Sequence, residues 1–146
     1  MKLKIVLLFF ISLNFIISAQ VKDESWFYDE AEKAINKENY EYAITILNEG
    51  KTSFPLSYRI SEKIGDLYFD KSLYSMALEA YKEGEELEPD NGSAIYKIGS
   101  TLGRLNENDD AILYYEKLLG YEDYKRLAID DLSWLYYKVH RLEESE

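Results

Sequence analysis

The residue types that carry most enzyme and metal chemistry are scarce in this chain. The 146 residues include no cysteine and a single histidine, His140. Without cysteine there can be no disulfide framework, no thiolate zinc site and no thiol nucleophile. A metal site would need a second histidine or carboxylates at ligand spacing, and neither an H-E-x-x-H motif nor a calcium-binding loop pattern occurs. We therefore expect neither a metal nor a cofactor.

Adjacent carboxylates are the remaining candidates for acid–base chemistry. They occur as Glu85-Glu86, Asp109-Asp110 and Asp130-Asp131. Neighbouring residues on a helix point about 100° apart, so such a pair cannot act jointly on one substrate. His140 follows a predicted helix, where a histidine usually interacts with the helix dipole. No G-x-S-x-G motif or phosphate-binding loop is present. The sequence thus predicts that the chain is not an enzyme.

The net charge limits the classes of partner. The chain has 28 acidic and 17 basic residues, which gives a formal net charge of −11. A nucleic-acid partner is not expected, because phosphate binding needs clustered Lys and Arg that release counterions. Hydrophobic residues at 47% and charged residues at 31% are ordinary globular values, which argues against wholesale disorder. We expect a protein or peptide partner that is neutral to basic.

The N-terminus has the features of a targeting segment. Its first twenty residues read MKLKIVLLFFISLNFIISAQ, with Lys2 and Lys4 before an apolar stretch and Ser18-Ala19 after it. This order predicts a secretory signal peptide, residues 1–19, and export to the periplasm or cell envelope, or secretion. The apolar stretch is shorter than the roughly 20 residues that span a bilayer, so we expect no stable membrane insertion, with an uncleaved anchor as the alternative. Cleavage removes two lysines and changes the net charge from −11 to −13.

A 34-residue period organises the rest of the sequence. Columns at this spacing are Ala43, Ala77 and Ala111; Ala31, Gly65 and Gly99; and Leu47, Tyr81 and Tyr115. The two prolines, Pro55 and Pro89, are also 34 residues apart. Agreement in several independent columns indicates a repeat protein.

Each repeat contains two predicted helices, because apolar residues recur at three- and four-residue steps in two successive segments. Pro89 should end the second helix of its unit near Glu88, and either Asn91 or Ser93 is expected to cap the next one. Turns within units are expected at 37–39 and 106–109. No strand pattern is found, so the predicted fold class is all-α.

The repeat columns resemble those of the tetratricopeptide-repeat (TPR) family. The match is best over residues 58–91, where Ile64-Gly65 resembles the Leu-Gly pair and is followed in order by Tyr68, Tyr74, Ala77, Tyr81, Gly84 and Pro89. Among the departures elsewhere are Glu30, Asn108 and Asp123, the last standing in the column of the prolines. The resemblance implies a TPR-like solenoid of about three and a half helix-turn-helix repeats over residues 20–146, with units 24–57, 58–91, 92–125 and a partial unit 126–146.

The fourth unit begins and does not finish. Residues 126–139 are predicted to form a helix, and residues 141–146 resemble the start of a second one. Either the helix is a terminal cap, which solenoids need for solubility, or the sequence belongs to a longer array. Trp134, Tyr136 and Tyr137 would form exposed aromatic surface if nothing covered them. Association of two copies through this C-terminal end is a further hypothesis.

In a solenoid of this kind the first helix of each unit lines a concave face. Counting through the repeats assigns these residues to that face as candidate partner contacts: Tyr28, Glu32, Arg59, Glu62, Asp66, Tyr96, Ser100, Asp130, Trp134 and Tyr137. Ile35, Phe69, Ser93 and Gly103 are assigned to it as well. Phe69, Trp134 and Tyr137 have the alternative interpretation of packing between helices.

The resemblance also guides the prediction of function. Some TPR proteins bind a C-terminal carboxylate with a set of Lys, Asn and Arg, but Tyr28 and Glu32 occupy the first-unit positions of that set. We therefore predict a non-catalytic, exported protein-interaction scaffold that binds a peptide or partner protein without that carboxylate clamp. The alternative is the N-terminal sensory or targeting part of a longer enzyme or receptor.

Overall fold

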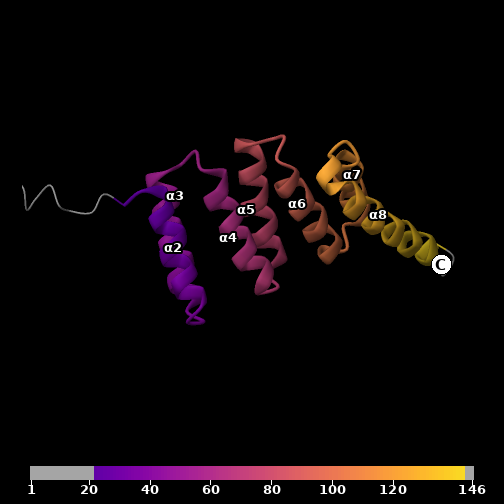
Figure 1. The fold of residues 1–146 in the computed structure, drawn as a ribbon. Coiled ribbons are helices and arrows are strands. Elements are labelled where there is room, and N and C mark those ends of the chain that lie inside the picture. Colours follow the sequence, from indigo (N-terminus) through magenta and orange to yellow (C-terminus); the bar gives the residue numbers. More distant parts are fainter. Residues whose placement is uncertain (1–21, 144–146) are drawn as a thin grey trace, which may run out of the picture.

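The computed structural model describes residues 22–143, which form seven helices and contain no strand (Figure 1). The helices are α2 (Glu24–Ile35), α3 (Tyr40–Ser53), α4 (Tyr58–Asp70), α5 (Tyr74–Leu87), α6 (Gly92–Leu105), α7 (Asn108–Leu118) and α8 (Glu122–Glu143). The all-α prediction is confirmed. The predicted signal peptide, residues 1–19, lies outside the described residues. Within residues 22–143, no helix combines the length and the apolar character needed to cross a membrane.

Short polar side chains start four of the helices. The caps of α2, α3, α4 and α6 are Asp23, Asn39, Ser57 and Asn91, and each accepts a hydrogen bond from a first-turn backbone N–H. Of the two candidates in the third unit, Asn91 is therefore the cap rather than Ser93. The helices α5 and α7 begin without a side-chain cap.

The ends of the helices follow the predicted junctions. Helix α5 ends at Leu87, just before Pro89, which cannot supply a backbone N–H. The turns within units lie between α2 and α3 and between α6 and α7. One residue in each within-unit turn adopts a left-handed conformation: Glu38, Ser72 and Asn106, with φ of 58°, 59° and 63°. These residues are 34 positions apart, so the turn geometry repeats with the sequence.

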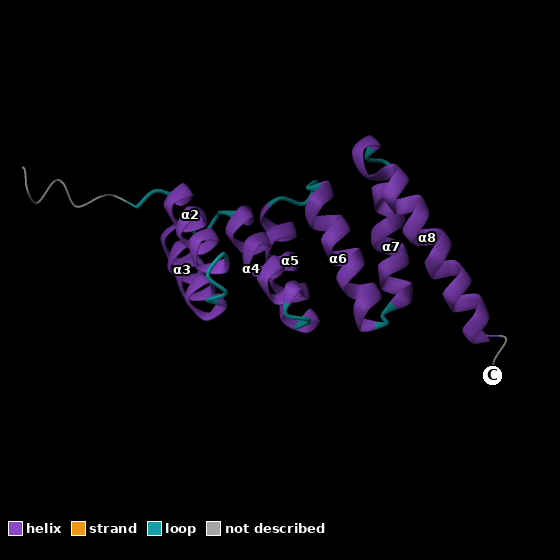
Figure 2. Cartoon of the chain, turned by 60° about the horizontal axis from the view of Figure 1, so that its bottom comes forward, coloured by secondary structure: helices purple, strands orange, loops and turns teal. Residues whose placement is uncertain are grey.

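The helices succeed one another along the array, each packed against its neighbours in sequence (Figure 2). One buried cluster joins α2 to α5, a second joins α5 to α8, and Tyr68 packs against both. The small residues of the repeat lie where helices approach closely. A Cβ at Gly65 would be 2.5 Å from the Tyr81 ring, and Ala77 is fully buried. The pairing of a small and a large residue thus sets the helix spacing within the unit.

The C-terminal region differs from the sequence prediction. The expected break between a helix at 126–139 and a second segment from 141 is absent, and α8 is one continuous helix of 22 residues. The prediction of a second helix starting at 141 was wrong for the residues that the structure describes. The physical reason is local: α8 contains no Gly or Pro to end it, and Asp123 stands in the column of Pro55 and Pro89, so the helix also begins early.

Candidate binding face

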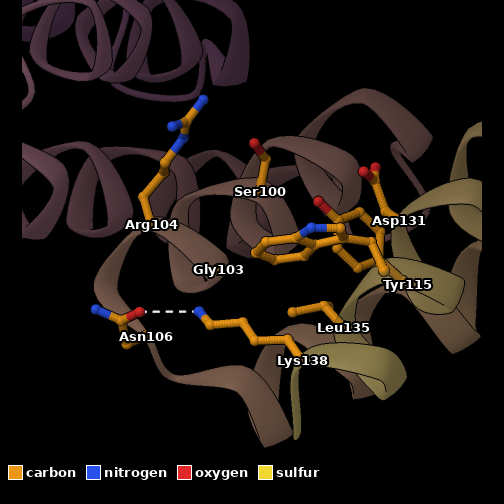
Figure 3. Close-up of a pocket in the computed structure, with 9 residues that line it drawn as sticks. Ser100, Gly103, Arg104, Asn106, Tyr115, Asp131, Leu135 and Lys138 are labelled. Carbon is orange, nitrogen blue, oxygen red and sulfur yellow. Dashed lines mark hydrogen bonds between the residues drawn. The ribbon is translucent and has the colours of Figure 1, made fainter. Parts of the chain in front are cut away.

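Three hollows lie between successive first helices, α2, α4, α6 and α8, and together they define what we name the first-helix face. The N-terminal hollow, between α2 and α4, is lined by Asp23, Glu24, Ser25, Tyr28, Asp29 and Arg59. The central hollow, between α4 and α6, is lined by Asp66, Phe69, Tyr81, Tyr96, Lys97 and Ser100. The C-terminal hollow, between α6 and α8, is lined by Ser100, Gly103, Arg104, Asn106, Tyr115, Asp131, Trp134, Leu135 and Lys138 (Figure 3). Ser100 lines both of the last two, so these hollows adjoin.

The N-terminal hollow is acidic, since three carboxylates and one guanidinium line it. The Tyr28 hydroxyl donates a hydrogen bond to Glu24 at 3.0 Å and lies 3.2 Å from the Ser57 hydroxyl, which ties α2 to the start of α4. The Arg59 guanidinium lies 5.1 Å from the centre of the Tyr28 ring. Burial raises the pKa of Tyr28 to about 12, so the phenol stays neutral at physiological pH. This hollow suits a basic group of a partner.

The central hollow is smaller, about 180 Å³, and its charges neutralise one another. The Lys97 ammonium lies 2.8 Å from Asp66 and 3.5 Å from Glu62, and the Tyr81 hydroxyl donates to Asp66 at 2.8 Å. Burial, with the neighbouring Asp66 carboxylate, raises the pKa of Tyr81 well above its usual range. Phe69 and Tyr96 provide its aromatic walls. Such a hollow suits an apolar side chain better than a charged one.

The C-terminal hollow, about 440 Å³, has cations at one edge and a carboxylate at the other. Lys138 donates hydrogen bonds to the amide oxygens of Asn106, at 2.9 Å, and Asn108, at 3.1 Å. In Figure 3, Asn106 and Lys138 lie on the side opposite Asp131, and Arg104 extends away from Lys138. Of these two cations, only Lys138 forms hydrogen bonds with other described residues.

Asp131 has two phenols among its neighbours. The hydroxyls of Tyr96 and Tyr115 act to lower the pKa of its carboxyl group. Burial nevertheless raises the pKa of Asp131, and that effect exceeds the lowering by these two hydroxyls. Asp131 therefore adds a partly buried carboxylate to the wall of this hollow.

Six of the ten predicted contact residues line a hollow: Tyr28, Arg59, Asp66, Tyr96, Ser100 and Trp134. The other four are placed differently. Glu62 is mostly buried beside Lys97, and Glu32 forms an ion pair with Lys63 that bridges α2 and α4. Asp130 and Tyr137 are exposed and line none of the three hollows.

Counting through the repeats missed seven charged residues that line the hollows: Asp23, Glu24, Asp29, Lys97, Arg104, Asp131 and Lys138. A signal for two of them was present, since Arg104 and Lys138 are 34 residues apart and share one repeat column. Within the part of the chain that the structure describes, no group of three His, Asp or Glu side chains is placed to hold a metal ion.

Comparison with known proteins supports the fold. No protein-family model matches the sequence, and no curated protein matches it. The first TPR of Spaghetti (RPAP3), solved bound to HSP90 peptide SRMEEVD, is 17% identical with a TM-score of 0.72, over 80% of this chain and 95% of that one. The Sgt2 TPR domain from Aspergillus fumigatus is 15% identical with a TM-score of 0.72, over 83% and 82%.

A third solved structure, the MamA protein, is 22% identical with a TM-score of 0.72, and the match covers 80% of this chain. The chain spans 63% of the length of MamA. At these identities, the likeness shows the order and stacking of the helices. Together with the 34-residue columns and the seven described helices, the likenesses establish a TPR-like helical solenoid as the fold of this chain.

Proposed function

We propose that this chain is a non-catalytic scaffold that binds an extended peptide or a segment of a partner protein on the first-helix face. The observation that carries the proposal is the series of hollows between successive first helices, which alternate aromatic walls with charged groups. A segment laid across the face would place successive side chains in successive hollows. One protein of similar fold, the first TPR of RPAP3, was solved with a peptide, which supports a peptide as the class of ligand.

The overall charge favours a partner segment that is neutral to basic. The net charge of −11 repels strongly acidic partners, including nucleic acid, at long range. The acidic N-terminal hollow adds a local site for Lys or Arg.

A selection experiment tests peptide binding directly. A random decapeptide library displayed on phage is panned against the purified chain, and the enriched peptides are measured by calorimetry. Ser100→Arg should abolish binding, because Ser100 lines both the central and the C-terminal hollow and a long side chain would fill them. Ser75→Arg, on the exposed surface of α5, is the matched control and should bind normally. No enrichment, or equal binding by both variants, would contradict the proposal.

Export is the second part of the proposal. It rests on the charge, apolar stretch and small-residue end of residues 1–19. The test is expression in a bacterium with fractionation and N-terminal sequencing. A chain that begins at Gln20 in the envelope or periplasmic fraction is expected, and an intact chain in the cytoplasm would contradict export.

Exposed apolar side chains on α8 favour self-association as an additional property. Leu127, Ile129, Trp134, Tyr136 and Tyr137 are between 45% and 61% exposed on this helix. Apolar surface concentrated on one helix is typical of an interface. Sedimentation over a range of concentrations should reveal a dimer that Ile129→Glu dissociates; a wild-type monomer at all concentrations would rule it out.

A further inference from the structure

Packing against the described residues gives no reason for glycine at position 103. A Cβ at Gly65 would meet Tyr81 at 2.5 Å, whereas a Cβ at Gly103 would meet no atom of the described residues within 4 Å. Glycine inside a helix is unfavourable relative to alanine, and Gly103 lies inside α6. It shares the repeat column of Ile35 and Phe69, so its missing side chain opens the C-terminal hollow. Because Gly103 has no side chain, the backbone of a bound segment can approach the backbone of α6 closely at this position.

Lys138 supplies an oriented positive charge at the edge of this hollow. An ammonium has three N–H donors, and Lys138 directs two of them to the neutral amide oxygens of Asn106 and Asn108. Its charge is therefore held in place without being neutralised, and one donor remains. The ammonium also lies 5.1 Å from the centre of the Trp134 ring. This arrangement favours an anionic ligand atom next to an apolar surface.

Arg104 is the second cation of the hollow and forms no ion pair with any carboxylate among residues 22–143. Elsewhere on the first-helix face the lysines are paired, Lys63 with Glu32 and Lys97 with Asp66. The C-terminal hollow is lined by two cations, neither in an ion pair with a described residue, and one carboxylate, Asp131. In a chain with a net charge of −11, this excess of positive charge is a local reversal of sign. A position in the last turn of α6 stabilises Arg104 through the helix dipole, but leaves its guanidinium donors free.

We infer that the C-terminal hollow is a subsite for an Asp or Glu side chain of the bound segment. The carboxylate binds Lys138, and the exposed Arg104 closes over it. The backbone of the segment crosses α6 at Gly103, and an apolar neighbour rests on Trp134, which is 57% exposed. With the acidic N-terminal hollow at the other end, the face selects a segment that carries a basic group at one end and a carboxylate at the other. This inference rests on the proposed peptide-binding function.

The experiment uses peptides selected on the wild-type chain from the phage library. Each is resynthesised with its Asp or Glu replaced by Asn or Gln, and affinities are measured by calorimetry. We expect this exchange to weaken binding about tenfold, since it removes a charge-assisted hydrogen bond. Arg104→Met and Lys138→Met should weaken the acidic peptide similarly, yet have little effect on its amide version. Lys82→Met, the same change on the exposed surface of α5, should leave both affinities unchanged.

Two further measurements separate binding from folding. Arg104 forms no ion pair or hydrogen bond with the described residues, so Arg104→Met removes only its interaction with the α6 dipole, and the amide version of the peptide serves as the control for that effect. Gly103→Ala should weaken the acidic peptide without lowering the thermal midpoint. The subsite is overturned if the selected peptides lack acidic residues, or if the carboxylate-to-amide exchange has no effect, while Ser100→Arg still abolishes binding. That result leaves the scaffold function intact, whereas a library with no enriched peptide overturns both.

Discussion

At the scale of single residues, glycine serves two different physical purposes in the first helices. Gly65 is required by packing, because the Tyr81 ring occupies the space of a Cβ. Gly103 faces open space, so its effect is to enlarge a hollow. The same residue type therefore stabilises the fold at one position and shapes a surface at the other.

We expect opposite effects of alanine at these two positions. Gly65→Ala should lower the free energy of unfolding by about 1–3 kcal/mol, because its Cβ would displace the buried Tyr81 ring. Gly103→Ala should raise it by about 0.5–1 kcal/mol, because alanine is the better helix former and meets no neighbour. Urea unfolding of both variants checks this pair, and a loss of stability in Gly103→Ala would show that its surroundings are not open.

The ion pair between α4 and α6 differs from those on the solvated surface. The Glu62 side chain is 13% exposed, and its Oε1 atom is buried and accepts no hydrogen bond from a described residue. Lys97 also reaches Asp66, so this one ammonium compensates two carboxylates. Removing it would leave the buried carboxylate of Glu62 without a counter-charge.

We accordingly expect Lys97→Met to lower the free energy of unfolding by about 1–3 kcal/mol. The control is Lys125→Met, whose partner Glu122 is 87% exposed, and there the change should stay within about 0.5 kcal/mol. Chemical denaturation measures both variants. Equal effects of the two substitutions would mean that burial does not distinguish the pairs.

At the scale of helices, local caps and turns account for most of the boundaries. Asn91 accepts hydrogen bonds from the backbone N–H groups of Ser93, at 2.9 Å, and Ala94, at 3.3 Å. Glu107, at the same place before α7, makes no such bond. Helix α6 therefore begins with a side-chain cap, whereas the next helix, α7, begins without one.

Asn91→Ala should lower the free energy of unfolding by about 1 kcal/mol, because two first-turn N–H groups of α6 lose their acceptor. Glu107→Ala removes no cap hydrogen bond and should change stability much less. Thermal unfolding followed by circular dichroism gives the comparison. If Glu107→Ala proved the more damaging, the assignment of the caps would be wrong.

Helix α8 shows where local reasoning fails. The repeat register predicts a turn after residue 139, and His140 falls in the column of the left-handed residues Ser72 and Asn106. The structure keeps His140 within α8. The repeat register predicts the position at which a turn is compatible with the array. A helix ends, however, only where its sequence contains a stop signal such as Gly or Pro, or where a neighbouring element blocks it, and α8 contains neither Gly nor Pro.

At the scale of the whole molecule, partly buried tyrosines make the stability of the fold depend on pH in the alkaline range. Burial raises the pKa of Tyr28 and of Tyr114 to about 12, and raises the pKa values of Tyr81 and Tyr115 further. The unfolded chain should titrate at its ordinary value near 10. An acid whose pKa is higher in the folded state holds more protons there, so its contribution to stability is complete below pH 10 and decreases as the pH rises above it.

The chain should therefore unfold cooperatively between about pH 10 and pH 12, with phenolate absorbance and loss of helix changing together. Ultraviolet absorbance and far-ultraviolet circular dichroism, recorded on one sample, follow the two events. The chain unfolded in urea is the control and should show phenol titration near the ordinary value of about 10. Complete phenol titration with helix retained would contradict the buried placement of these side chains.

The sequence by itself determined the period, the fold class and most helix boundaries. Spacing of apolar residues, caps and prolines are local properties, and they do not depend on what a helix meets. The same spacing located the first helices and eight of the residues that line the hollows, namely the six named above together with Phe69 and Gly103.

Only the tertiary structure decided how the charges on the first-helix face are used. Lys97 is neutralised by side chains one repeat away, while Lys138, in a later unit, contacts two neutral amides and an indole ring and forms no ion pair within residues 22–143. The structure likewise selected Asp131 over Asp130 for the C-terminal hollow. Ion pairing and hollows depend on which side chains meet across units, and that depends on the packing of neighbouring helices rather than on position within a repeat.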